Sequence, residues 1–449
     1  MHIIAISIIV LMSWINTATS QQWEFLGFTD QIIYSIAIDP QNPEIMYVGT
    51  EATDLNTEIG IGAIFKTFNG GSNWDTLATN IFQPKLVINP KDTDIIYRFS
   101  GKIYKSEDAG LNWVKSDSGI NYAQFASVTL LAIDQNHPDT LYSGTGGFDH
   151  TGPFKSINGG RSWHSIWGNI DLWDSIFSIL ITKDSTNILY LATDGRGSIY
   201  KSINGGESYE NLTGNLWSGA IIFSLLISPS KGNILYAGGL FGNSDYDTWW
   251  ISKSIDDGNS WVIADSGMFG DKVQSMVINE NDENILYAGI NTGLFKTINA
   301  ATSWFQIETS YLASCDIQCL TFHPYDPNII YVGTKKGVYR FTEKSDVNLH
   351  QNQESQVPEI GLFQNYPNPF NNRTVIRYYL SKFGHVTIAI YNLKGQLIRV
   401  LIDKSIDSGY HEVLWNGKDR ESKSVCSGLY FCKIRHNSYT KIMKLVLIE

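Results

Sequence analysis

The sequence is poor in cysteine. Its 449 residues include only four, Cys315, Cys319, Cys426 and Cys432, too few for the disulfide framework of a small secreted domain. Their spacings do not follow the Cys and His pattern of a zinc site. A local disulfide would require the chain to turn, because strand residues four apart lie about 13 Å from each other. Small, partly buried thiols are the favoured interpretation, and a disulfide at Cys315/Cys319 or Cys426/Cys432 stays open.

Basic residues are also scarce. The chain has 33 Lys and Arg against 44 Asp and Glu, a net charge of −11, which argues against a nucleic-acid partner because phosphate binding needs a basic face. The imbalance is uneven. Residues 362–449 hold 13 basic and 6 acidic residues, +7, which leaves 20 basic and 38 acidic residues, −18, before them. Such asymmetry predicts two units with different partners.

Long apolar runs are missing, and no stretch reaches the 18 residues of a membrane span. The apolar run from Ile3 to Ile15 is shorter than that and is followed by the small residues Ala18-Thr19-Ser20. This pattern predicts a signal peptide at residues 1–20, cleaved near Gln21. The mature protein is therefore expected to be exported and to have no membrane span.

A repeat fills the next 300 residues. A strand-like motif beginning with Tyr recurs at steps of 44 to 51 residues, and each copy follows a second apolar strand, often closed by a Pro turn. The seven copies begin at Tyr47, Tyr97, Tyr142, Tyr190, Tyr236, Tyr287 and Tyr331. Each period therefore opens with two short strands.

Six of the seven copies are followed by a second motif: Ser or Thr, any residue, Asp or Asn, any residue, Gly, two further residues and an aromatic residue. Its Asp or Asn is predicted to accept backbone N–H bonds across a tight turn, and its Gly to adopt a left-handed conformation. The sixth copy has Ala301 in place of Gly, which predicts a strained or altered turn. The six turn residues are Asn69, Asp108, Asn158, Asn204, Asp256 and Asn299.

These six segments resemble the Asp-box, or BNR repeat, of sialidases, sortilin-type receptors, xyloglucan-cleaving enzymes and photosystem assembly factors. The resemblance implies an all-β propeller, in which the Asp-box is a structural turn remote from the active sites. Four strands per period and seven periods predict a seven-bladed β-propeller at residues 21–342. The segment from Gln22 to Leu26 is predicted to supply the last strand of the seventh blade and close the ring.

Residues 343–361 are polar and are predicted to form a linker. Short alternating strands follow at 362–449 and predict a small Ig-like β-sandwich. This segment resembles the type A sorting domain of type IX secretion through Asn365–Phe370, Tyr391–Gln396, Gly409–His411, Trp415–Gly417 and Gly428–Tyr430. The resemblance implies transfer across the outer membrane to the cell surface or the medium, with the type IX machinery as the partner of residues 362–449.

A ligand site is expected on the propeller face opposite the Pro turns and Asp-box-like segments, where longer loops collect. These loops supply aromatic residues beside carboxylates, a combination that suits sugar rings. The competing interpretation is that the aromatic residues cap the apolar space between blades. The candidate ligand residues are Phe148, Asp149, His150, Trp173, Asp174, Trp217, Asp245, Trp249 and Trp250.

Motifs for catalysis are sparse. The propeller has four Arg (Arg98, Arg161, Arg196 and Arg340), one of them inside an Asp-box-like turn, which fits a sialidase poorly. No cofactor or metal-binding motif is present, so none is expected. The sequence predicts an exported, non-catalytic recognition or scaffold module for a glycan or surface protein. The alternatives are a secreted glycoside hydrolase with paired carboxylates and an assembly factor for an envelope complex.

Overall fold

A computed structural model describes most of the chain. The described residues are 23–53, 60–120, 127–147, 152–170, 175–183, 185, 187–193, 198–213, 216, 220–243, 246–270, 272–309, 311–314, 316–343, 360–362, 365, 368–380, 382–407, 409–437 and 439–448. The proposed signal peptide and nearly all of the proposed linker lie outside these residues.

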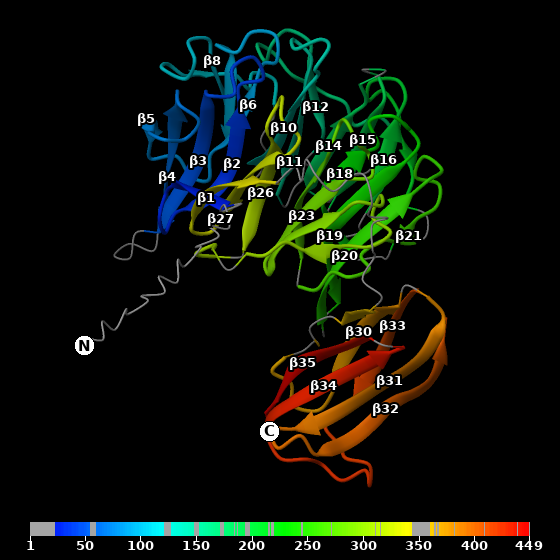
Figure 1. Cartoon of the computed structure of the whole chain (residues 1–449). Helices are drawn as coiled ribbons and strands as arrows, with labels where there is room; N and C mark the ends of the chain where they lie inside the picture. The colour runs from blue at the N-terminus through cyan, green and yellow to red at the C-terminus, as the bar shows by residue number, and fades with distance from the viewer. Residues whose placement is uncertain are drawn as a thin grey trace, which may run out of the picture.

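Seven four-stranded antiparallel sheets, arranged as blades around an axis, make up the first body (Figure 1). Blades one to three are β2 (Ile32–Ile38), β3 (Met46–Thr53), β4 (Gly60–Thr67) and β5 (Asp75–Thr79); β6 (Lys85–Ile88), β7 (Ile96–Ser100), β8 (Lys102–Ser106) and β9 (Val114–Lys115); and β10 (Ser127–Ile133), β11 (Leu141–Gly146), β12 (Phe154–Ser156) and β13 (His164–Ser165). Blades four to six are β14 (Ile176–Ile181), β15 (Leu189–Thr193), β16 (Ile199–Ser202) and β17 (Glu210–Asn211); β18 (Ala220–Ile227), β19 (Leu235–Asn243), β20 (Tyr246–Ser254) and β21 (Val262–Ile263); and β22 (Val273–Ile278), β23 (Leu286–Ile290), β24 (Gly293–Thr297) and β25 (Phe305–Gln306).

The seventh blade combines the two ends of the propeller. It contains β26 (Ile317–Phe322), β27 (Ile329–Thr334) and β28 (Gly337–Thr342), and its outer strand is β1 (Trp23–Gly27). Strand β1 pairs antiparallel with β28 and places Trp23 opposite Phe341. The seven-bladed fold and its closure by the N-terminal strand are confirmed.

The core lies between neighbouring blades. The second strand of each blade has the repeated Tyr near its start and is buried almost throughout, because sheets cover both of its faces. The aromatic residue that ends the Asp-box-like segment also packs between neighbouring blades. Trp163, Trp261 and Trp304, for example, are buried. Burying these large rings is the main contribution of the repeat to stability.

The turns after the first strands and the Asp-box-like segments share one face, as predicted. In each of the first six blades, the fourth residue of the segment donates its backbone N–H to a carbonyl of that turn; examples are Ala109 to Asp94 at 2.9 Å and Gly159 to Asp139 at 2.9 Å. The opposite face carries the longer connections. We call these two surfaces the box face and the long-loop face.

The sixth segment shows what the missing glycine changes. The glycines of the other five segments have positive φ, for example 93° at Gly110, and Ala301 adopts the same left-handed conformation at 65°. Its N–H still bonds to Thr297 Oγ1 at 3.1 Å. The turn keeps its hydrogen bonds and accepts backbone strain, because a β-carbon disfavours positive φ.

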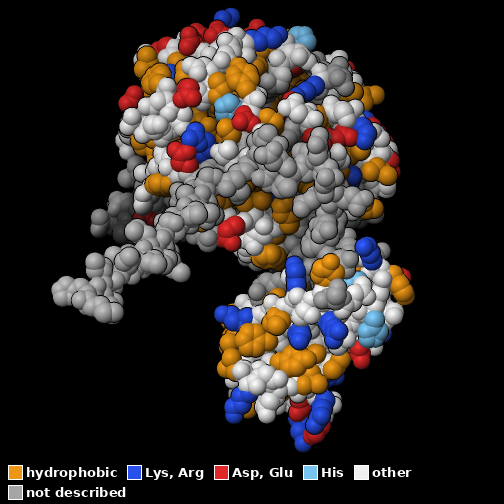
Figure 2. Space-filling view, viewed as in Figure 1, with side chains coloured by type: hydrophobic (Ala, Val, Ile, Leu, Met, Phe, Trp, Pro, Cys, Tyr) orange, Lys and Arg blue, Asp and Glu red, His pale blue; other side chains and the backbone are white. Residues whose placement is uncertain are grey.

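The C-terminal segment forms a two-sheet sandwich. One sheet contains β29 (Ile360–Leu362), β30 (Thr374–Leu380) and β33 (Gly409–Trp415); the other contains β31 (Gly384–Asn392), β32 (Leu397–Ile406), β34 (Gly428–His436) and β35 (Tyr439–Leu447). Trp415, Phe370 and Tyr430 pack together between the sheets. Lys and Arg side chains are scattered over the visible face of the sandwich, between hydrophobic side chains, in Figure 2.

The thiols of the described cysteines are free. Cys319 is half-buried, Cys426 is exposed and Cys432 is buried. The open question of a Cys426/Cys432 disulfide is therefore decided in favour of two thiols, whereas Cys315 lies outside the described residues.

Candidate functional site

Most of the residues predicted to bind a ligand lie outside the described residues: Phe148, Asp149, His150, Trp173, Asp174, Trp217 and Asp245. The structure places the backbone of Trp249 and Trp250 in β20, opposite Leu240 and Gly239 of β19. Residues 239–243 of β19 and 246–250 of β20 therefore belong to two paired strands. The proposed ligand contacts of these nine residues remain predictions.

The Asp-box-like segments hold their turns through side-chain oxygens. Asp108 Oδ1 accepts the backbone N–H of Asn112 at 2.8 Å and the hydroxyl of Ser106 at 2.7 Å. These bonds hold the pKa of Asp108 at about 2, the backbone N–H of Asn112 being the largest cause. The corresponding oxygens of Asn69, Asn158, Asn204, Asp256 and Asn299 accept equivalent backbone N–H bonds.

A ring of hydrogen bonds joins the first strands of neighbouring blades around the axis. Six of the seven strands contain a β-bulge near their start, which frees backbone groups from the ladder. Small polar side chains form hydrogen bonds with these backbone groups. The seven links, which we call the inner ring, are Ser35 to Pro84, Lys85 to Thr129, Thr129 to Ile176, Leu225 to Ser178, Met276 to Ser224, Leu320 to Ser275 and Cys319 to Ile33.

Lys85 is the charged member of the inner ring. Its Nζ donates to the carbonyl of Thr129 at 3.2 Å, and burial lowers its pKa, against a smaller opposing effect of Cys319. Burial raises the pKa of the Cys319 thiol to about 12. These two side chains come from the second and seventh blades, which lie on either side of the first blade.

The bulges lie at the long-loop end of the inner ring, because each first strand starts at that face and ends at the box face. We call this end of the inner ring the channel mouth. Glu51, near the end of β3, pairs with Ile32 at the start of β2. Burial, followed by the charge of Glu51, raises the pKa of Tyr34 to about 12. Tyr34, Lys85 and Gln274 lie at the starts of β2, β6 and β22. We call these three residues and Glu51 the channel-mouth cluster.

Two acceptors of the channel-mouth cluster are buried without a hydrogen-bond partner in the described part of the chain: Glu51 Oε2 and Gln274 Oε1. Glu51 is only 8% exposed. Buried polar atoms in proteins are nearly always hydrogen-bonded, so an unpaired acceptor calls for a specific explanation. These two atoms can accept hydroxyl or amide donors.

A second polar system, not predicted from the sequence, joins the blades at the box face. In every blade the repeated Tyr stands directly opposite a basic residue of the third strand. The pairs are Tyr47/Lys66, Tyr97/Lys105, Tyr142/Lys155, Tyr190/Lys201, Tyr236/Lys253, Tyr287/Lys296 and Tyr331/Arg340. The signal was present: a Lys precedes the Ser or Thr of all six Asp-box-like segments.

These Tyr–Lys pairs reach the next blade. Tyr97 donates to the carbonyl of Gly159 at 3.1 Å, and Lys253 donates to that of Ala300 at 2.9 Å. Both carbonyls belong to the fourth residue of the following Asp-box-like segment. In the sixth blade Tyr287 and Lys296 bind Glu343, which takes the place of the missing segment. The pairs therefore tie successive blades together.

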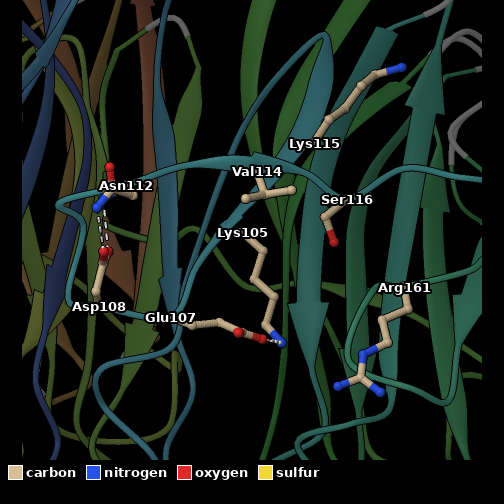
Figure 3. Close-up of a pocket in the computed structure, with 8 residues that line it drawn as sticks. All are labelled: Lys105, Glu107, Asp108, Asn112, Val114, Lys115, Ser116 and Arg161. Atoms are coloured by element: carbon tan, nitrogen blue, oxygen red, sulfur yellow. Dashed lines mark hydrogen bonds and ion pairs between the residues drawn. The ribbon is translucent and has the colours of Figure 1, made fainter.

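A pocket of about 370 Å³ opens at the box face between the second and third blades (Figure 3). It is lined by Lys105, Glu107, Asp108, Asn112, Val114, Lys115, Ser116 and Arg161. Among the residues that the structure describes, no group of three or more His, Cys, Asp or Glu side chains could hold a metal ion.

Comparison with known families identifies the C-terminal body. The model of the secretion system C-terminal sorting domain matches residues 364–449. The chain ends in a type IX secretion sorting domain. The sorting domain directs the protein to the cell surface or the medium. Within the described residues no helix is long and apolar enough to cross a membrane.

Solved structures resemble the chain in fold at low sequence identity. A GH74 enzyme of Niastella koreensis has a TM-score of 0.56 and 15% identity over 96% of this chain and 75% of that one. PorZ, an essential surface component of the type IX secretion system of Porphyromonas gingivalis, has a TM-score of 0.50 and 16% identity over 93% of this chain and 59% of that one.

YCF48 from Cyanidioschyzon merolae has a TM-score of 0.51 and 12% identity over 71% of this chain and 98% of that one. These likenesses show the fold of the propeller and not its activity. Comparison with curated proteins gave no match.

Proposed function

We propose that the exported propeller is a non-catalytic recognition module that binds a glycan over the channel-mouth cluster on the long-loop face. The observation that carries this proposal is the pair of buried acceptors, Glu51 Oε2 and Gln274 Oε1, without a partner among the described residues. Sugar hydroxyls are donors of the kind these atoms accept, and the half-buried Tyr34 supplies an aromatic surface near Glu51.

Two extended hairpins support a binding role for this face. Strands β3 and β4 have eight residues each, and β19 and β20 have nine each, whereas β15 and β23 have five. The additional residues continue the strands beyond the repeat toward the long-loop face. Because the inner ring and the Tyr–Lys pairs fix the blades beneath them, these hairpins offer a preorganised surface, which lowers the entropic cost of binding.

The described carboxyl groups favour binding over hydrolysis. A glycoside hydrolase needs a general acid, usually a carboxyl group whose pKa is raised. The carboxyl groups whose pKa is displaced in the described residues are Glu107, Asp108, Asp256 and Glu283, and all four are displaced downward. They belong to box-face turns and not to the long-loop face.

A secreted glycoside hydrolase is the second candidate, since two GH74 enzymes share the fold with TM-scores of 0.56 and 0.59. The chain covers 75% and 63% of these two enzymes, but 98% of YCF48. YCF48 has also been solved with a D1 peptide bound, so a protein ligand is the third candidate.

The test is a polysaccharide panel with two readouts on the same samples. Purified protein is measured for retention on each polysaccharide and for release of reducing ends. Retention without release, weakened by Glu51→Ala or Gln274→Ala, supports the glycan-binding proposal. Release of reducing ends would establish the hydrolase instead, and capture of a protein ligand with no polysaccharide retained would favour the third candidate.

A further inference from the structure

The pocket between the second and third blades departs from the repeat at two positions. The second residue of the Asp-box-like segment is apolar and exposed in five of the six copies, namely Phe68, Ile157, Ile203, Ile255 and Ile298, whereas the second blade has Glu107. The sixth residue is Arg161 in the third blade, where the other copies have Ser72, Leu111, Glu207, Asn259 and Thr302. Both departures line the same pocket.

Glu107 changes the local connection between blades. In the first, third and fifth blades, the Lys of the Tyr–Lys pair donates to a carbonyl of the next Asp-box-like segment. In the second blade, Lys105 turns instead to Glu107 Oε1 at 2.7 Å, and Tyr97 alone reaches Gly159. Figure 3 shows the Lys105–Glu107 ion pair on one side of the pocket and Arg161 extending toward it from the neighbouring blade.

Arg161 is the cation of the pocket that lacks an ion pair among the described residues. Lys105 pairs with Glu107, and Lys115 pairs with Asp117 at 3.1 Å. The remaining acidic side chain, Asp108, is committed to its turn, with bonds to both of its oxygens. Arg161 is exposed, so it can receive an anionic group from solution.

The other walls provide what a sugar ring requires. The Val114 side chain is 71% exposed and offers an apolar surface. Asn112 and Glu107 also line the pocket, and their side-chain oxygens are of a kind that accepts from hydroxyl groups. The hydrogen bond from Lys105, followed by the charge of Lys105, lowers the pKa of Glu107, so this carboxylate is ionised at neutral pH.

We propose that this pocket binds a uronic-acid residue of an acidic polysaccharide. Arg161 pairs with the sugar carboxylate, since a guanidinium binds a carboxylate through two parallel hydrogen bonds. Val114 supports the apolar face of the ring, while Asn112 and Glu107 accept from its hydroxyls. A segment of acidic amino acids fits less well because it has no ring for Val114 to support and no ring hydroxyls for Asn112 and Glu107 to accept from. The volume lies in the usual range for small-molecule sites, about 300–1,000 Å³.

The site is independent of the proposed long-loop ligand, because it lies on the box face. The test uses the mature chain and calorimetry with two probes, a galacturonic-acid trisaccharide and the corresponding neutral galactose trisaccharide. The acidic probe is expected to bind, more tightly at low salt than at high salt, and the neutral probe is not. Arg161→Asn introduces the residue that the fifth copy carries at this position, so the turn should tolerate it.

Arg161→Asn is expected to weaken binding of the acidic trisaccharide about tenfold or more, because a charge-assisted hydrogen-bond pair is lost, and Arg161→Lys is expected to restore part of it. The control Lys91→Gln removes an exposed cation outside the pocket and should leave binding unchanged. An unchanged melting temperature shows that the Arg161→Asn variant is folded. Absence of binding to the unmodified protein, equal binding of the neutral probe, or full binding by Arg161→Asn overturns the proposal.

Discussion

Trp23 and Phe341 stand directly opposite each other across β1 and β28, and their ring centroids are 4.8 Å apart. They are separated by more than three hundred residues, so this contact closes the circle of blades. The indole N–H of Trp23 also donates to the carbonyl of Glu308 in the sixth blade at 2.7 Å. One side chain therefore joins the N-terminal strand to two blades.

Replacing Trp23 by Ala should destabilise the propeller by about 3–5 kcal/mol, because a 5% exposed aromatic side chain and its hydrogen bond are removed together. Phe25→Ala is the matched control, since this residue lies on the same strand and is 48% exposed; it should cost about 1 kcal/mol or less. Urea unfolding followed by Trp fluorescence measures both. An equal loss of unfolding free energy in the two variants would show that β1 does not close the ring through Trp23.

The Tyr–Lys pairs predict a difference between two Tyr residues in equivalent positions. Tyr97→Phe removes the hydrogen bond to Gly159 and should cost about 1 kcal/mol, or more if that carbonyl stays unpaired. Tyr236→Phe is the control: this residue is equally buried, but its hydroxyl has no hydrogen-bond partner among the described residues. Chemical denaturation should show a smaller loss for Tyr236→Phe. The pairs would have no role in joining blades if both variants were as stable as the parent protein.

His323 predicts a pH dependence of stability. Its Nδ1 accepts the backbone N–H groups of Tyr325 and Asp326, which requires an unprotonated nitrogen, and burial lowers its pKa below the ordinary 6.5. The unfolded chain therefore binds the proton more tightly than the folded one. The stabilisation of the fold by neutral His323 is complete above pH 6.5 and is lost as the pH falls below that value.

The variant that tests this is His323→Asn, because Asn89 and Asn279 cap the equivalent turns of the second and sixth blades. Melting temperatures of the parent protein should decline between pH 7 and pH 5, and the decline should be smaller in His323→Asn. Parallel curves for the two proteins would show that His323 does not titrate on unfolding.

The described thiols should differ in reactivity. Burial raises the pKa values of Cys319 and Cys432 to about 12, whereas Cys426 is exposed. Because the thiolate is the reactive form, alkylation at pH 8 should modify Cys426 in the native protein, and the other two only after unfolding. Peptide mass spectrometry locates the modification. Rapid native labelling of Cys319 would mean that the inner ring opens on the time scale of the reaction.

The sequence predicted the parts of the fold that repeat with a fixed period. The Tyr of each second strand is buried between blades, and the aromatic residue that ends each Asp-box-like segment is buried or half-buried there, so their spacing carries the blade count. The seventh period lacks a fourth strand, and Gln22–Leu26 matches the missing one. The sequence therefore also predicted how the ring closes. The sandwich followed from its motifs, which belong to a known sorting domain.

The polar connections between blades were not predictable from single periods. Ser178 and Cys319 look unrelated in the sequence, yet both occupy the position after a bulge where a side chain reaches the next strand. Lys105 and Arg161 lie in different repeats and share a pocket only because the blades are neighbours. The nine predicted ligand residues could be chosen only by residue type, because the conformation of a loop does not follow from the period of the repeat.

The most direct test of the central claim measures binding and turnover of one polysaccharide by the same preparation. The account predicts that the purified protein is retained on at least one polysaccharide, that Glu51→Ala reduces this retention, and that no reducing ends are released. Two results would contradict a non-catalytic glycan-binding site at the channel mouth. One is release of reducing ends in proportion to the protein concentration, and the other is retention that neither Glu51→Ala nor Gln274→Ala reduces.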